Sequence, residues 1–316
     1  MCMIFSKNNF RLLLAGTLTL LTLSACKNFD GDITVPAYIH LDHIDIVPQA
    51  QNAPSVEPGF YSSSVDAVQL VGYFEGDKEE TDFGSFQLPF TTPILRHGTL
   101  KYLHAYPVIK QSGQAAFRVY YTFYQPVTLY GITLSPDSVT NLGTLNPDSQ
   151  KWTLNANYHG RDIMTVHCED YFEPTTFSTN FDTNLTWVKN DPENACTGQG
   201  YAMLHVADSE STKTFTCTKE LSPNERNTFY LEIDYKSDLE LWVQLLGFEY
   251  LGTTAVVKSV MTLYPTDEWR KVYINLGKTW SWFNYNVPLT LFFQASNPQG
   301  VGGNVYIDNV KVISMK

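Results

Sequence analysis

Short runs of β-branched and aromatic residues, separated by turn-forming residues, recur along almost the whole chain. The first half of the sequence contains such runs at 34–46, 65–74, 83–88, 99–106, 117–123 and 127–134. The second half contains eight more, at 201–206, 214–218, 229–235, 240–246, 256–263, 269–276, 289–295 and 305–313. The 19 tyrosines and 19 phenylalanines suit pleated, half-buried surfaces, and almost no helical periodicity interrupts the runs. The chain is therefore predicted to be all-β.

The spacing of these runs predicts two domains, which is the number expected for 316 residues. Strands at intervals of ~8–12 residues in region 34–150 indicate an N-terminal β-sandwich. Residues 151–171 are predicted to be a linker segment. The eight runs after it predict that region 172–316 is a jelly roll of eight antiparallel strands in two sheets.

The N-terminus has the features of an export signal. Lys7 and Arg11 precede an apolar stretch of 12 residues at 12–23, which is too short to span a bilayer comfortably. The motif Leu23-Ser24-Ala25-Cys26 follows directly and matches the bacterial lipobox. The sequence thus predicts a cleaved lipoprotein signal peptide at 1–25, lipidation of Cys26, and a lipidated tether at 26–33. An ordinary secretory signal followed by an incidental cysteine is the alternative.

The charge of the chain argues against nucleic-acid binding. The net charge is −11, and removal of the signal leaves 19 basic and 32 acidic residues, a net charge of −13. Such a surface repels phosphate backbones, and no basic stripe offsets it. The predicted partners are therefore the membrane, through the lipid, and a protein or glycan.

Export also determines how the cysteines are interpreted. After cleavage and lipidation, Cys168, Cys196 and Cys217 remain. An oxidising compartment permits one disulfide and one thiol, and we predict the pair Cys196–Cys217 because both lie early in the second domain. Three buried free thiols are the alternative. The Cys-x-x-Cys spacing typical of metal ligands is absent.

A cluster of aromatic residues near the C-terminus is the clearest candidate for ligand binding. Trp280, Trp282, Phe283 and Tyr285 lie within six residues, between two predicted strands. Aromatic rings bind sugar faces and dominate protein-binding hot spots, so this loop is a candidate binding platform. Alternatively, the four rings cap the core of the sandwich. Two further tryptophans, at 242 and 269, lie inside predicted strands and are interpreted as core residues.

Catalytic signatures are absent from the sequence. It contains no nucleophile elbow, no His-Glu-x-x-His motif, no P-loop and no dinucleotide fingerprint. His40 and His43 are predicted on opposite faces of one strand, so they cannot bind one metal ion. The chain is therefore predicted not to be an enzyme.

Several motifs resemble known families. The lipobox followed by Pro36-Ala37-Tyr38-Ile39, together with the stretch 86–95, resembles Bacteroidota outer-membrane surface lipoproteins. The stretches 200–205, 230–235 and 268–275, with Tyr306-Ile307-Asp308-Asn309-Val310, resemble galactose-binding-like jelly rolls, the fold of many carbohydrate-binding modules. The first resemblance implies an outer-membrane, cell-surface location. The second implies fold rather than function, since this fold has many roles.

The second resemblance also implies a metal site. Asp308 matches a position that holds a structural Ca²⁺ in many galactose-binding-like domains, and Glu173 is its natural partner. Apart from this Ca²⁺, no cofactor is predicted. The alternative is that Asp308 and Asn309 bond locally to the backbone of a turn.

These observations lead to three functional hypotheses. The first is a non-catalytic subunit that docks on an outer-membrane β-barrel complex, such as a transporter or a protein-assembly or secretion machine. It predicts a large exposed aromatic patch on a domain face and no polar cleft. The alternative is a surface glycan-binding lipoprotein that uses the jelly roll or the loop around Trp280. The third is a glycoside hydrolase, which requires two facing carboxylates that the sequence does not single out.

Overall fold

The computed structural model describes residues 34–48, 58–174, 180–222, 228–249, 252–284 and 287–316. Strands dominate these ranges, which confirms the all-β prediction. The helical elements are the 3-10 helix η2 (Pro58–Tyr61) and the helix α2 (Gly277–Trp280). Within the described ranges, no helix is long and apolar enough to cross a bilayer. The predicted signal peptide and Cys26 lie outside the described residues.

The N-terminal domain is a β-sandwich around one core. One layer is the sheet β4-β3-β6-β7, in which β8 also pairs with β6, and the other layer consists of the sheets β5-β1-β9 and β10-β11-β2. The strands are β1 (Ala37–Leu41), β2 (His43–Val47), β3 (Ala67–Phe74), β4 (Thr81–Gln87), β5 (Phe90–Ile94), β6 (Gly98–Lys110), β7 (Arg118–Tyr120), β8 (Val127–Leu134), β9 (Val139–Asn141), β10 (Thr144–Asn146) and β11 (Lys151–Asn157).

The predicted strand at 34–46 is divided in two at Asp42. The N–H of Asp42 donates to the carbonyl of Trp152, and its carboxylate accepts the N–H of Trp152 at 2.8 Å. β1 then pairs in parallel with β9, and β2 pairs in parallel with β11. This division explains why one layer of the sandwich consists of two small sheets.

The C-terminal domain is a two-sheet jelly-roll sandwich. One sheet has the order β13-β14-β21-β16-β19, with β12 also pairing β21, and the other has the order β15-β20-β17-β18. The strands are β12 (Met164–Asp170), β13 (Thr186–Val188), β14 (Tyr201–Val206), β15 (Thr212–Leu221), β16 (Phe229–Ser237), β17 (Glu240–Phe248), β18 (Ala255–Leu263), β19 (Thr266–Asn275), β20 (Leu289–Ser296) and β21 (Gly303–Met315).

The predicted linker at 151–171 is wrong, because most of it forms two strands. β11 pairs with β2 in the N-terminal domain, and β12 pairs with β21 in the jelly roll. The jelly roll therefore begins near Met164 rather than at residue 172. Both strands find partners far away in the sequence, so local composition did not reveal them.

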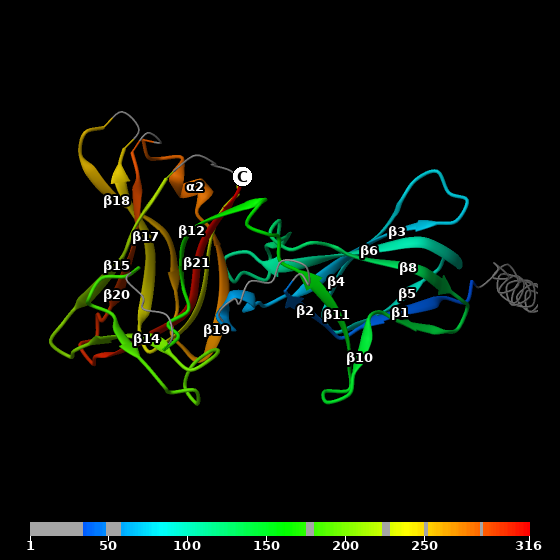
Figure 1. Ribbon diagram of the computed structural model, residues 1–316, viewed down its shortest axis with the longest axis horizontal. Coiled ribbons are helices and arrows are strands. Elements are labelled where there is room, and N and C mark those ends of the chain that lie inside the picture. The colour runs from blue at the N-terminus through cyan, green and yellow to red at the C-terminus, as the bar shows by residue number, and fades with distance from the viewer. Residues whose placement is uncertain (1–33, 49–57, 175–179, 223–227, 250–251, 285–286) are drawn as a thin grey trace, which may run out of the picture.

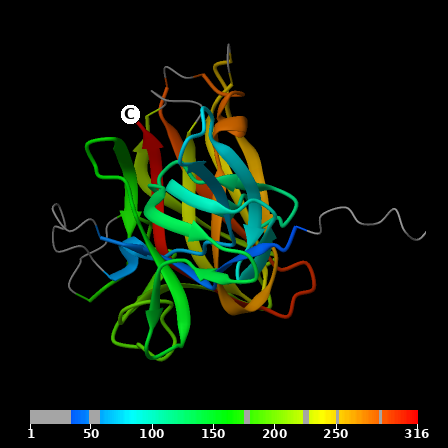
Figure 2. The same ribbon diagram turned by 90° about the vertical axis from the view of Figure 1, so that its right-hand side faces the viewer.

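The two domains meet through the β21-β16-β19 sheet, which lies between the four-stranded sheet and the N-terminal domain (Figures 1 and 2). Tyr230, Tyr273 and Ile313 on this sheet belong to the N-terminal hydrophobic core. The outer face of the sheet is therefore covered where these strands meet the N-terminal domain. The four-stranded sheet lies on the far side of the jelly roll (Figure 1).

A buried charge cluster holds this interface. Lys311 and Glu232 are fully buried and form an ion pair at 2.9 Å. Glu232 also accepts a hydrogen bond from the hydroxyl of Tyr121 at 2.6 Å, and Lys311 donates to the carbonyl of Phe60 at 2.6 Å. Burial would raise the pKa of Glu232, but Lys311 and Lys271 hold that pKa below its usual value. The cluster thus ties β16, β19 and β21 to the N-terminal domain.

Candidate functional site

The aromatic loop predicted as a binding platform is mostly part of the core. Trp280 is 2% exposed and its ring contacts Phe229 edge-on, with ring centroids 4.3 Å apart. Phe283 is 1% exposed, whereas Trp282 is 67% exposed. The prediction is therefore wrong for Trp280 and Phe283, because α2 turns both rings into the jelly-roll core. Tyr285 lies outside the described residues.

The four-stranded jelly-roll sheet presents aromatic and amide side chains on its outward surface. Trp242 on β17 lies opposite Gln294 on β20, and Gln244 lies opposite Phe292. The adjacent edge strand β18 places Thr262 and Ser259 beside them. We call this set the jelly-roll outer face: Trp242, Gln244, Ser259, Thr262, Phe292 and Gln294. None of the six is charged, but Glu240 lies on the same face and accepts a hydrogen bond from the ring nitrogen of Trp242 at 3.4 Å.

Gln244 has an unsatisfied group at the centre of this face. Its side chain is buried by its neighbours and the residue is only 6% exposed. The amide nitrogen donates to the Ser259 hydroxyl at 3.2 Å, but no described group bonds to the carbonyl oxygen Oε1. A buried acceptor without a donor costs about 1–3 kcal/mol. Oε1 is closed to solvent, so a ligand hydroxyl would remove this cost only after a neighbouring side chain shifted.

A second exposed face, on the N-terminal domain, is rich in tyrosine. Tyr73 and Tyr102 stack across β3 and β6 with centroids 5.3 Å apart, and Tyr106 contacts Tyr120 at 5.5 Å. Tyr130 lies opposite Tyr102 in the register and is 74% exposed. We call these five residues the tyrosine face. It is the exposed aromatic patch that the docking hypothesis predicts.

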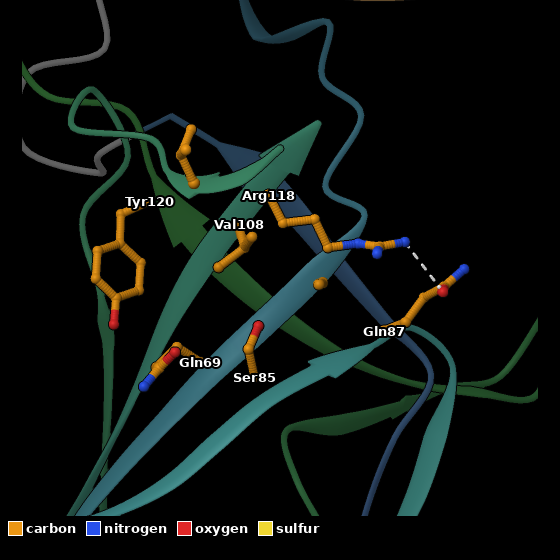
Figure 3. Close-up of a pocket in the computed structure, with 8 residues that line it drawn as sticks. Gln69, Ser85, Gln87, Val108, Arg118 and Tyr120 are labelled. Atoms are coloured by element: carbon orange, nitrogen blue, oxygen red, sulfur yellow. Dashed lines mark hydrogen bonds between the residues drawn. The ribbon is translucent and has the colours of Figure 1, made fainter. Parts of the chain in front are cut away.

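A shallow groove of about 500 Å³ adjoins the tyrosine face. In Figure 3, Arg118 extends toward Gln87, to which it donates at 3.1 Å, and Tyr120 stands at the opposite side. Arg118 also pairs with Asp66 at 2.5 Å. Arg118 also donates to the carbonyl of Ala115 at 3.0 Å. Because three partners hold its guanidinium group, Arg118 forms a fixed side of the groove and is not free to bind an anion.

The predicted calcium ligands lie near each other. Glu173 is 4% exposed and Asp308 is fully buried. The N–H of Thr197 donates to Asp308 at 3.2 Å, and the N–H of Gln199 donates to Glu173 at 3.1 Å, so one short segment lies against both carboxylates. Burial raises the pKa of Asp308 to about 8, and the neighbouring Asp234 and Glu173 add to the rise.

The donor set at this position is incomplete but suited to calcium. Among the described residues, no group of three or more His, Cys, Asp and Glu side chains is arranged to hold a metal. Two carboxylates supplemented by neutral oxygens are compatible with Ca²⁺, which accepts backbone and amide carbonyls. The hydrogen bonds from Thr197 and Gln199 also agree with the alternative of local backbone bonding.

The predicted disulfide between Cys196 and Cys217 is wrong. All three described cysteines are free, and the sulfur nearest to Cys217 is that of Cys168, with the Sγ atoms 3.0 Å apart. Cys168 and Cys217 both belong to the jelly-roll core. Cys196 is instead adjacent to Asp234, at the charged interface. Pairing therefore follows which strands face each other, not closeness in sequence.

Sequence reasoning also misplaced two other tryptophans. Trp242 and Trp269 were expected in the core, but both are only partly buried. The Trp269 ring nitrogen donates to the carbonyl of Asn194 at 2.9 Å. The signal that could have revealed Trp242 is its alternation with Leu241 and Val243, which are fully buried.

Similarity to known proteins is found at the level of solved structures. No family model matches the chain, and no curated protein matches it. One similar solved structure is described as a study of the promiscuous specificity of carbohydrate-binding modules of the β-sandwich superfamily. It is 14% identical to this chain, the match covers 88% of this chain and 98% of that one, and the TM-score is 0.36. A xylan-binding domain of carbohydrate-binding family 22 is 12% identical. The match covers 47% of this chain and 94% of that domain, with a TM-score of 0.32. A family 11 carbohydrate-binding module from a cellulase of Clostridium thermocellum is 11% identical. The match covers 48% of this chain and 96% of that module, with a TM-score of 0.33. At these TM-scores, the likeness carries no argument about the ligand of this chain.

Proposed function

We propose that this chain is a non-catalytic, lipid-anchored glycan-binding protein of the outer-membrane surface. Its binding site is the jelly-roll outer face. The observation that carries the proposal is the unsatisfied carbonyl oxygen of Gln244, which lies just beneath the outward surface, between the half-buried rings of Trp242 and Phe292. Sugar rings offer C–H faces for aromatic stacking and hydroxyl groups for amides, so both features suit a neutral saccharide.

Substitutions at this face are expected to separate binding from stability. Gln244→Leu removes the unsatisfied carbonyl together with the hydrogen bond from the amide nitrogen to Ser259, so the two effects offset and folding stability should stay about equal. Binding to the best glycan of an immobilised panel should nevertheless weaken at least tenfold. Trp242→Ala should weaken binding by about 2 kcal/mol, roughly 30-fold, as expected for a central aromatic contact. Calorimetric titration and thermal unfolding measure the two quantities.

The matched control is Gln69→Leu, which changes the same residue type on the N-terminal sheet. It should leave glycan affinity unchanged. If Gln244→Leu and Gln69→Leu bind the glycan equally well, the jelly-roll outer face is not the binding site.

A second candidate function is docking to an outer-membrane protein, such as a β-barrel complex, through the tyrosine face. The supporting observation is that Tyr120 and Tyr130 are 51% and 74% exposed. Tyrosine supplies large contact areas with a polar end and is enriched at protein interfaces. This surface is distinct from the jelly-roll outer face, so both functions are compatible in one chain.

We expect a Tyr120→Ala/Tyr130→Ala variant to lose a stoichiometric membrane partner if docking occurs. The measurement is affinity purification of the lipidated protein from gently solubilised membranes of its own cells. Each exposed tyrosine should contribute about 1–2 kcal/mol, so the double change should weaken the complex ~30-fold or more. Equal recovery of the partner by both forms would exclude the tyrosine face.

We also propose that Glu173 and Asp308 hold a structural Ca²⁺. The burial of Asp308 supports the proposal, because its pKa of about 8 disfavours the ionised form at neutral pH even though two backbone N–H groups donate to the carboxylate. Ca²⁺ at 100 times its dissociation constant should stabilise the fold by about 2.7 kcal/mol. The folded-state pKa of Asp308 exceeds the unfolded value of about 3.9, so in chelator stability should fall as the pH rises from about 4 to 8.

Thermal unfolding with Ca²⁺ or with chelator, at pH 5 and pH 8, measures this effect. The stabilisation by Ca²⁺ should be larger at pH 8, and Asp308→Asn should remove most of it. Equal melting temperatures with Ca²⁺ and with chelator at both pH values would favour the alternative, in which the two carboxylates bond only to the backbone.

A further inference from the structure

A groove of about 560 Å³ lies where the two domains meet. The jelly roll contributes residues of β18, β19 and the segment between them, including Tyr264, Trp269 and Arg270. The N-terminal domain contributes the end of β6 and the turn after it, including Lys110 and Gln114. We call it the junction groove. Neither domain alone forms it, and domain junctions are a common location for ligand sites.

The junction groove adjoins the jelly-roll outer face. Thr262 on the edge strand β18 lies opposite Trp242 in the register, and the same Thr262 lines the groove. Beyond this edge, Tyr264 is 67% exposed and Trp269 is partly buried. A chain-like ligand that crosses the outer face from Trp242 toward β18 would pass round this edge strand to enter the groove, which lies on the side of the N-terminal domain.

The groove differs from the outer face in its charge. Lys110 and Arg118 both pair with the single carboxylate of Asp66, at 2.5 Å each. Lys271 is 3% exposed at its side chain and is neutralised by Asp234 and Glu232. Arg118 lies outside this lining, and the pairings neutralise Lys110 and Lys271, so Arg270 leaves the lining of the groove net positive on a strongly acidic chain.

Arg270 is the cation available to a ligand. It is exposed on β19, lines the groove, and has no ion pair with any residue in the described part of the chain. Asp267 and Glu268 precede it on the same strand but do not line the groove. A guanidinium group binds planar anions with two parallel hydrogen bonds. Arg270 therefore gives the groove a preference for an anionic group.

We infer that the junction groove binds an anionic sugar unit of the same glycan whose neutral units lie on the jelly-roll outer face. This inference rests on the proposed function and specifies its ligand as an acidic saccharide. Trp269 and Tyr264 contact the ring of the anionic unit, and Arg270 binds its carboxylate or sulfate. The same geometry accepts a uronate or a sulfate ester, and both share the anionic substituent.

The test compares matched saccharides on the full-length mature protein. The probes are galacturonate hexasaccharide as the free acid, the same hexasaccharide as its methyl ester, and a sulfated galactose hexasaccharide with its desulfated form. Wild-type protein should bind at least one anionic member about tenfold more tightly than its neutral counterpart. Raising NaCl to 1 M should reduce the difference, because salt screens the exposed charge.

Substitutions separate this inference from the proposed function. Arg270→Gln should abolish the anionic preference and leave binding of the neutral forms unchanged. Trp242→Ala should weaken the neutral and anionic forms alike. The matched control is Arg96→Gln, since Arg96 is an exposed arginine that pairs with Asp77 in the N-terminal domain, and it should change neither quantity.

Three results would overturn the inference. Equal affinity for anionic and neutral forms in the wild type, or an anionic preference that survives Arg270→Gln, overturns the anionic site and leaves the glycan-binding function intact. Absence of binding to every member of the set and to the glycan panel overturns both.

Discussion

Replacing Lys311 with methionine is expected to lower the free energy of unfolding by about 3–5 kcal/mol. Lys311 and Glu232 are both fully buried, and their ion pair spans 2.9 Å. Methionine preserves the volume of the side chain but leaves Glu232 with the more distant Lys271, at 3.7 Å, as its remaining cation. Thermal unfolding should show a decrease on the order of 10 °C in melting temperature.

A double variant distinguishes the charge effect from lost packing. In Lys311→Met/Glu232→Gln, the buried charge is gone, and the amide oxygen still accepts from the hydroxyl of Tyr121. More than half of the lost stability should return, because replacing both members of a buried pair is often nearly neutral. Lys151→Met, at an exposed position, is the control. A Lys311→Met protein within 1 kcal/mol of wild type would mean that the pair does not stabilise the interface.

The strands could be predicted from the sequence because alternation is a local property. On β17, Leu241 and Val243 share one face, whereas Trp242 shares the other with the polar Glu240 and Gln244. Alternation therefore marks the Trp242 face as the outward one. The interpretation of Trp242 as a core residue rested on its place inside a predicted strand, without regard to which face it occupies, and it is wrong.

Long-range pairing limited the rest of the prediction. The segment 151–171 had no clear partner in sequence, yet β11 pairs with β2 and β12 pairs with β21. The same limit applies to Cys217, whose neighbour Cys168 is 49 residues away. Charged residues inside apolar strands, such as Glu232 and Lys311, were the available signal for the domain interface. An isolated charge in a strand that is otherwise buried must find a partner, but the sequence does not say in which domain.

Trp280→Ala is expected to lower the free energy of unfolding by about 3–5 kcal/mol, whereas Trp282→Ala should change it by no more than about 0.5 kcal/mol. The two residues are neighbours in the same aromatic loop, but Trp280 is 2% exposed and Trp282 is 67% exposed. Trp280→Phe should destabilise the fold less than Trp280→Ala. The Trp280 ring nitrogen has no hydrogen-bond partner among the described residues, so replacing it with phenylalanine loses no hydrogen bond. Thermal unfolding of the three variants tests the order.

Glycan binding by the same variants separates the core from the ligand site. If Trp280→Ala loses binding but Trp280→Phe, which retains the packing, does not, the loss reflects a damaged core. If both variants lose binding, the Trp280 side chain itself contributes to the site. Weaker glycan binding by the stably folded Trp282→Ala protein would instead place part of the ligand site at the loop, beside the jelly-roll outer face.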